Sequence, residues 1–173
     1  MTQAALRPAP PFDLAPWQRV GLLTAGGALL ALTAYAGGRA GLGLAPATPW
    51  VRDVALILHL ATVIPAIPLG LFIFLSRKGG ARHKLLGKIW LTLMGMTAIA
   101  TLFIRNIEDG GFSWIHIFSV MTLFAIPKAI LTARRGNIAE HKAHLLALFV
   151  GALLIAGGAS FLPHRTMWLW AFG

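Results

Sequence analysis

The residues of this chain that could do chemistry are its histidines, six of them in a sequence without cysteine. An imidazole can ligate a metal, carry a proton or form a hydrogen bond, depending on its charge and tautomer. His59 and His116 sit in strongly apolar surroundings, ILHLATV and FSWIHIF. An ionisable side chain in such a span is a functional candidate, because burying it in a bilayer costs free energy. His83 and His141 lie in more basic stretches between apolar runs.

The composition places these histidines in a membrane protein. Hydrophobic residues make up 57% of the chain, charged residues 12%, and the mean hydropathy is +0.75, values outside the range of a soluble domain. Crossing the hydrocarbon core takes about 20 apolar residues in a helix, and the sequence lacks the alternation of membrane strands. We predict an all-α integral membrane protein with five transmembrane helices, near residues 20–35, 54–75, 85–104, 114–133 and 144–162.

The second to fifth helices are expected to form a four-helix core bundle, with the first helix packed outside it. Residues 1–16 are expected to be an irregular N-terminal tail, and residues 17–173 a single transmembrane helical domain. The tail lacks a charged region followed directly by an apolar stretch and a cleavage site, so it does not resemble a signal peptide. We therefore expect the first helix to stay in the mature protein.

The formal net charge of +10 is concentrated in two links. The link between the second and third helices holds Arg77, Lys78, Arg82, Lys84 and Lys88, and Lys128, Arg134, Arg135 and Lys142 flank the link between the fourth and fifth. The positive-inside rule puts these links and the N-terminus in the cytoplasm. We expect contact with the lipid bilayer and no nucleic-acid binding, since a membrane bundle offers no module that enters a groove.

This orientation pairs the histidines. His59 and His116 fall near the outer ends of the second and fourth helices, while His83 precedes the third helix on the inner side and His141 starts the fifth. Antiparallel helices carrying histidines in this order would build two stacked sites, one between the second and fourth helices and one between the third and fifth.

Haem b is the cofactor that this layout favours. Haem iron takes two axial imidazoles from facing helices, and its propionates meet arginines near the membrane interface. Arg52 and Arg105 are placed for this role outside, and Arg77 and Arg82 inside. The predicted function is haem binding with electron transfer across or within the membrane, together with a quinol or a membrane redox complex.

Other interpretations remain open. A zinc or copper site would use the inner cluster His83, His141, His144 and Glu140. A proton or quinol site could draw on Glu108 and Asp109. Each histidine could also be a hydrogen-bond donor between helices, for example to Thr62, Ser119 or Thr122. The whole chain could be a non-catalytic accessory subunit of a larger respiratory or photosynthetic complex, or a metal- or proton-linked transporter, although the spans lack carboxylates and an inverted repeat.

Four motifs, in order, resemble a bacterial family of small membrane proteins catalogued as domain of unknown function 2306. They are ILHLATVIPAIPLG, RKGGARHKLLGKIW, GGFSWIHIFSVMTLFAIPKAI with ARRGNIAEHKAH, and GALLIAGGASFLPHR. The resemblance covers roughly residues 54–166 and implies the inner membrane of a bacterium. It implies shared histidines at 59, 83, 116 and 141, whereas the family often has Met in place of His144 and Gly in place of His164. The histidine order also resembles, in layout only, the di-haem transmembrane b-type cytochromes.

The charge distribution yields a prediction of topology. A reporter fused after Gly80 or Gly136 should be cytoplasmic, and one fused after Gly110 should be outside, because the basic links are retained in the cytoplasm. Paired reporters active on opposite sides of the membrane would measure this. The inverted pattern would contradict the placement of both histidine pairs.

Overall fold

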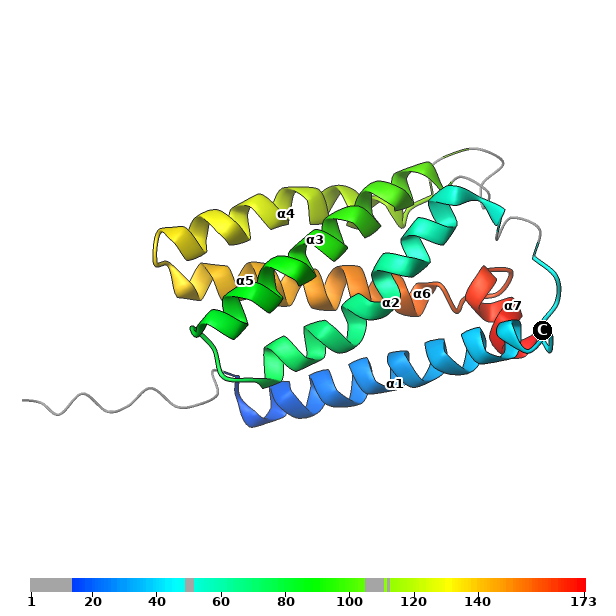
Figure 1. Ribbon diagram of the computed structural model, residues 1–173, viewed down its shortest axis with the longest axis horizontal. Helices are drawn as coiled ribbons and strands as arrows, with labels where there is room; N and C mark the ends of the chain where they lie inside the picture. Colours follow the sequence, from blue (N-terminus) through cyan, green and yellow to red (C-terminus); the bar gives the residue numbers. More distant parts are fainter. Residues whose placement is uncertain (1–13, 49–51, 105–110, 112) are drawn as a thin grey trace, which may run out of the picture.

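The computed structural model describes residues 14–48, 52–104, 111 and 113–173. Within these residues the chain is helical without strands, and five helical spans are long and apolar enough to cross a membrane. The spans lie roughly lengthwise along the molecule and alternate in direction (Figure 1). They are α1 (Pro16–Gly41), α2 (Val54–Leu75), α3 (Ala81–Phe103), α4 (His116–Arg134) and a fifth span made of α5 (Ile138–Ala147), η2 (Leu148–Ile155) and α6 (Ala156–Ala159).

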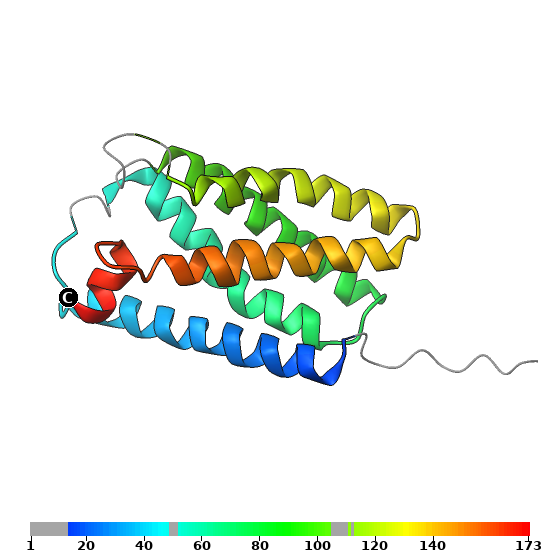
Figure 2. The same cartoon turned by 180° about the vertical axis from the view of Figure 1, so that it is seen from behind.

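The second to fifth spans form the predicted core. Helix α2 packs against α3, α3 against α4 and α4 against α5, while η2 closes the ring against α2. Helix α1 lies at one edge, where it contacts α2 and η2 (Figures 1 and 2). The all-α fold with a four-helix core is therefore confirmed. Residues 1–13 of the predicted tail lie outside the described residues, and α1 begins at Pro16.

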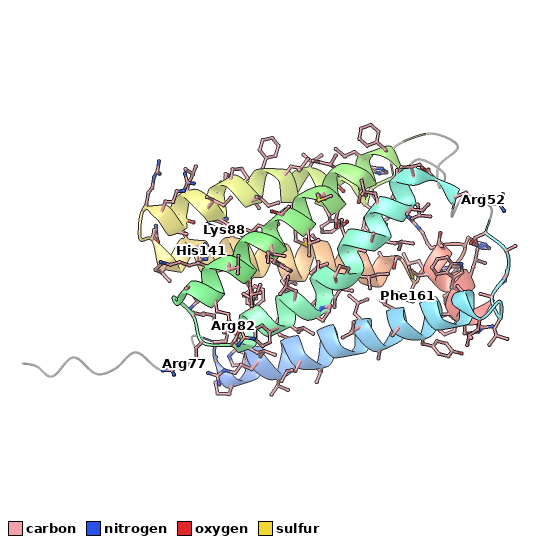
Figure 3. The ribbon with its side chains drawn as sticks, viewed as in Figure 1. Arg52, Arg77, Arg82, Lys88, His141 and Phe161 are labelled. Atoms are coloured by element: carbon pink, nitrogen blue, oxygen red, sulfur yellow. The ribbon has the colours of Figure 1, made fainter. Side chains whose placement is uncertain are left out.

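The two ends of the bundle differ in the links and helix ends that they hold. The basic end holds the links at residues 76–80 and 135–137, and Figure 3 shows Arg77, Arg82 and His141 toward that end. The opposite end, which we call the C-terminal end, holds the start of α2 and α4 and the chain terminus (Figure 1). Arg52 lies at this C-terminal end (Figure 3).

Helix boundaries at the basic end differ from the prediction. His83 was expected in the link, but it lies in the first turn of α3. The fifth span begins at Ile138 rather than near residue 144, because the Asn137 side chain caps it by accepting a hydrogen bond from Glu140 N at 3.3 Å. Capping and turn residues, not the onset of high hydropathy, set where these helices start. Both basic-end histidines therefore lie on helices.

The C-terminal end also differs from the prediction. The fourth helix was expected to begin near residue 114, with His116 near its outer end, and the structure makes His116 the first residue of α4. A short helix, α7 (Thr166–Phe172), was not predicted, because seven residues are too few to span a bilayer. The guanidinium of Arg39, near the end of α1, donates to the carbonyls of Ala171 at 2.7 Å and Gly173 at 3.0 Å. These hydrogen bonds hold α7 against the end of α1.

The fifth span contains a π-helical stretch, η2. Hydrogen bonds from residue i to i+5 are rare, and such stretches are frequent at functional sites. In η2, Gly151 lies next to Phe118 of α4, and Ala152 and Leu153 face a cavity described below.

The tightest packing lies between α2, α3 and η2. Trp90 and Phe149 are almost completely buried, and the Trp90 indole donates to the carbonyl of Ala66 at 2.9 Å. A Cβ on Gly70 would lie 2.7 Å from Trp90 Nε1 and 2.8 Å from Phe149 Cε2. Gly70 therefore permits the close approach of three helices.

We predict that Gly70→Ala destabilises the bundle by about 1–3 kcal/mol, since the new methyl overpacks a filled core. Gly87→Ala is the matched control, because a Cβ there meets nothing within 4 Å and alanine is favoured in a helix by up to about 1 kcal/mol. Thermal unfolding in detergent would measure both. Equal unfolding temperatures for the two variants would show that a methyl at Gly70 does not overpack the core.

Candidate functional site

A cavity of about 310 Å³ lies in the C-terminal half of the bundle. All five spans contribute to its wall, and residues 163–167, leading into α7, also line it. The wall is mainly apolar, with polar groups from His59, His116 and several hydroxyl side chains. The volume is at the lower end of the range for small-molecule sites. The two histidines predicted as the outer pair therefore face one cavity.

The ring of His59 has a defined tautomer. Its Nδ1 lies 2.8 Å from Thr101 Oγ1, and that hydroxyl donates to the carbonyl of Thr97 at 2.7 Å. Since the hydroxyl has one proton and gives it to Thr97, His59 Nδ1–H must be the donor to Thr101. Nε2 then keeps its lone pair, and no described residue hydrogen-bonds to it. Of the suggested partners, Thr62 instead donates to the Leu58 carbonyl.

His116 uses both ring nitrogens. The side chain is only 7% exposed. Its Nε2 lies 3.2 Å from the carbonyl of Ile104, which can only accept, so Nε2 carries the proton. Nδ1 accepts from Ser113 N–H at 3.0 Å, and the carbonyl of Ser113 also lies 2.9 Å from it. The ring thus ties the end of α3 to the start of α4. It could offer Nε2 to a ligand by giving up its hydrogen bonds to the Ile104 carbonyl and from Ser113 N–H and donating Nδ1–H to the Ser113 carbonyl.

The second pair lies at the basic end. His141 Nδ1 lies 2.8 Å from the carbonyl of Ala129 on α4, so Nδ1–H donates and Nε2 keeps its lone pair. His83 Nδ1 is buried and has no hydrogen-bond partner among the described residues. His83 also lies within electrostatic range of His141 and Lys78. The structure therefore puts the pair predicted between the third and fifth helices at the same end of the bundle.

The predicted arginines take different positions. Arg82 stacks over the ring of Phe72, 4.9 Å from its centroid, in a cation–π contact. Arg52 lines a separate hollow beside Thr48 and Trp170, away from the histidine cavity. Arg105 lies outside the described residues.

An arginine that the sequence analysis did not select, Arg165, lines the histidine cavity. It follows the last predicted span in the segment FLPHR, near the end of the chain. Its place at the cavity depends on how α7 folds back, which hydropathy does not indicate.

The inner zinc or copper cluster is not formed. Among residues 14–48, 52–104, 111 and 113–173, no three His, Asp or Glu side chains gather as a metal site. His83, His141, His144 and Glu140 therefore do not form the set of three or four ligands that zinc or copper would need. Glu108 and Asp109, suggested for a proton or quinol site, lie outside the described residues.

Residues 56–170, which include both histidine pairs and Arg165, match the family described as predicted membrane protein (DUF2306). The chain belongs to this family. The resemblance found in the sequence motifs is thus confirmed, and α1 lies outside the match. Comparison with curated proteins and with solved structures gave no match.

We predict that Thr101→Val releases the tautomer of His59, because valine keeps the shape of threonine but cannot accept Nδ1–H. The ¹⁵N shifts of a histidine-labelled sample would show protonated Nδ1 and unprotonated Nε2 in the wild type and a mixture in the variant. Thr122→Val is the control, since the Thr122 hydroxyl donates to the carbonyl of Phe118. Unchanged His59 shifts in Thr101→Val would show that Thr101 does not fix the ring.

Proposed function

We propose that this protein binds haem b at two sites and carries electrons across or within the membrane, in exchange with a quinol or a membrane redox partner. One observation carries the proposal: each end of one four-helix core holds a histidine from each of two alternate helices. His59 and His116 face the same cavity at one end, and His83 lies within electrostatic range of His141 at the other. Facing imidazoles on two helices are the arrangement that haem iron uses.

Hydrogen bonding to the rings supports this function. A ligating histidine usually donates its other ring nitrogen to a protein acceptor, which fixes the tautomer and the ring orientation. His59 does so through Thr101, and His141 through the carbonyl of Ala129. Both keep the Nε2 lone pair that a metal would take. The unsatisfied Nδ1 of His83 is a further buried nitrogen available to a ligand.

His116 fits the site only after a local change. Ligation by Nε2 would give up the Nε2–H bond to Ile104 and move the ring proton to Nδ1, where the Ser113 carbonyl lies 2.9 Å away. The protein therefore already holds an acceptor for the ligating tautomer. Ser113 N–H, which now donates to Nδ1, would lose Nδ1 as its acceptor. We expect His59 to contribute more than His116 to the affinity of this site, since its ring needs no such exchange.

The cavity wall supplies apolar surface for the haem macrocycle. Apolar side chains from α2, α3 and η2 line the cavity beside the histidines, and haem, when bound, would supply one-electron chemistry. A macrocycle is larger than a small ligand that fills 310 Å³, so side chains at the opening must move apart to admit it. We place the protein in a bacterial inner membrane with the basic end and the N-terminus in the cytoplasm, because the basic links cluster there.

Single substitutions would test the two sites. We expect protein purified after expression with adequate haem to show sharp reduced-minus-oxidised bands, with one haem for each histidine pair. His59→Ala or His116→Ala should remove one haem, and His83→Ala or His141→Ala the other. His144→Ala, on the same helix as His141, should retain both. A colourless wild type, or bands that survive all four substitutions, would refute the proposal.

A further inference from the structure

Arg165 is a cation at the wall of the histidine cavity, and no carboxylate side chain among residues 14–48, 52–104, 111 and 113–173 pairs with it. In the described part of the chain, its guanidinium makes one hydrogen bond, to Ser113 Oγ at 3.5 Å, the outer limit for such a contact. The described carboxylates, Asp53 and Glu140, are not among the residues that line the cavity. A half-buried guanidinium beside apolar walls is costly unless an anion meets it.

The backbone before Arg165 is shaped to hold it there. Arg165 N–H donates to the carbonyl of Leu162 at 3.2 Å, closing a turn with Pro163 and His164 at its centre. His164 has a φ of 66°, which a side-chain-bearing residue seldom adopts, while proline at the preceding position suits a type II turn. A strained residue of this kind persists where the surroundings require it. Here the turn places Arg165 on the cavity side, next to the segment that supports His116.

The other two described arginines at the C-terminal end, Arg39 and Arg52, do not line the histidine cavity. Arg39 is engaged by the carbonyls of the α7 terminus, and Arg52 lines the separate hollow. Arg165 alone among these three lines the cavity that holds His59 and His116.

We propose that Arg165 binds a carboxylate of the ligand in this cavity, so that the site takes an apolar ring system bearing an acid group. This inference rests on the proposed haem function and identifies the propionate as the group that Arg165 recognises. The guanidinium presents a planar fork of N–H donors that matches a carboxylate in bidentate geometry. The ligand would be held at its apolar face by the cavity wall, at its iron by His59, and at its acid group by Arg165.

The test uses two ligands, haem b and its dimethyl ester, in which both propionates are neutral methyl esters. Apo-protein carrying His83→Ala, which leaves only the cavity site, is titrated in detergent and followed by absorbance. We expect haem b to bind about ten- to hundredfold more tightly than the ester, the range for a hydrogen bond to a charged group. Adding Arg165→Gln should weaken the binding of haem b by a similar factor and leave the affinity for the ester unchanged. Adding Arg165→Lys should restore part of the preference.

Arg52→Gln is the matched control, and it should keep the full preference for haem b over the ester. Equal affinity of the two ligands for the protein with Arg165 intact would overturn the role of Arg165 while leaving haem binding in place. An Arg165→Gln variant that weakens both ligands equally would show a structural role only and would also overturn it. Absence of binding by either ligand would refute the haem function itself, and this inference with it.

Discussion

The hydrocarbon core contains no water, so each imidazole nitrogen within it must find a partner in the protein or in a ligand. This constraint organises the candidate site. His59 and His141 each place one nitrogen on a protein acceptor and leave the other open, whereas His116 places both on backbone groups. The four rings are therefore not equivalent, although all four lie within the first two turns of their helices. Whether a ring has a nitrogen free to bind a ligand therefore depends on which of its nitrogens the neighbouring helices engage in hydrogen bonds.

The packing of the bundle separates a filled region from a hollow one. Around Gly70 the side chains of Trp90 and Phe149 occupy the space between α2, α3 and η2, and Phe74 packs against both rings at 6.0 and 5.2 Å between centroids. Toward the C-terminal end, the same helices stand apart around the histidine cavity. Rigid packing in one region of the bundle thus fixes the helices that hold His59 and Thr101 at the edge of the other.

The elements of the fold could largely be predicted from the sequence, because hydropathy over about 20 residues reports directly on the bilayer. The end of the bundle at which each histidine lies followed from the order of the histidines along the chain, since antiparallel helices alternate in direction. The partners of the rings could not be predicted. Thr101 reaches His59 only because α3 packs on α2 in one rotational setting, and Ser113 reaches His116 only because α4 starts at that histidine. Arg165 was missed because its position depends on α7 folding back against α1, a contact fixed by backbone carbonyls and Arg39.

The π-helical stretch Leu148–Ile155 changes the direction in which side chains point around the fifth span, so α5 and α6 on either side of it do not continue one regular helix. One residue more or fewer in a helix turns everything beyond it by about 100°. On one side of the stretch, His141 is turned toward the Ala129 carbonyl of α4; on the other, Ala156 and Gly157 are turned toward the cavity. A wider helical turn allows these two faces to be set independently. The number of residues in this stretch, more than their identity, therefore decides whether the fifth span can point His141 toward α4 at one end and Ala156 and Gly157 toward the cavity at the other.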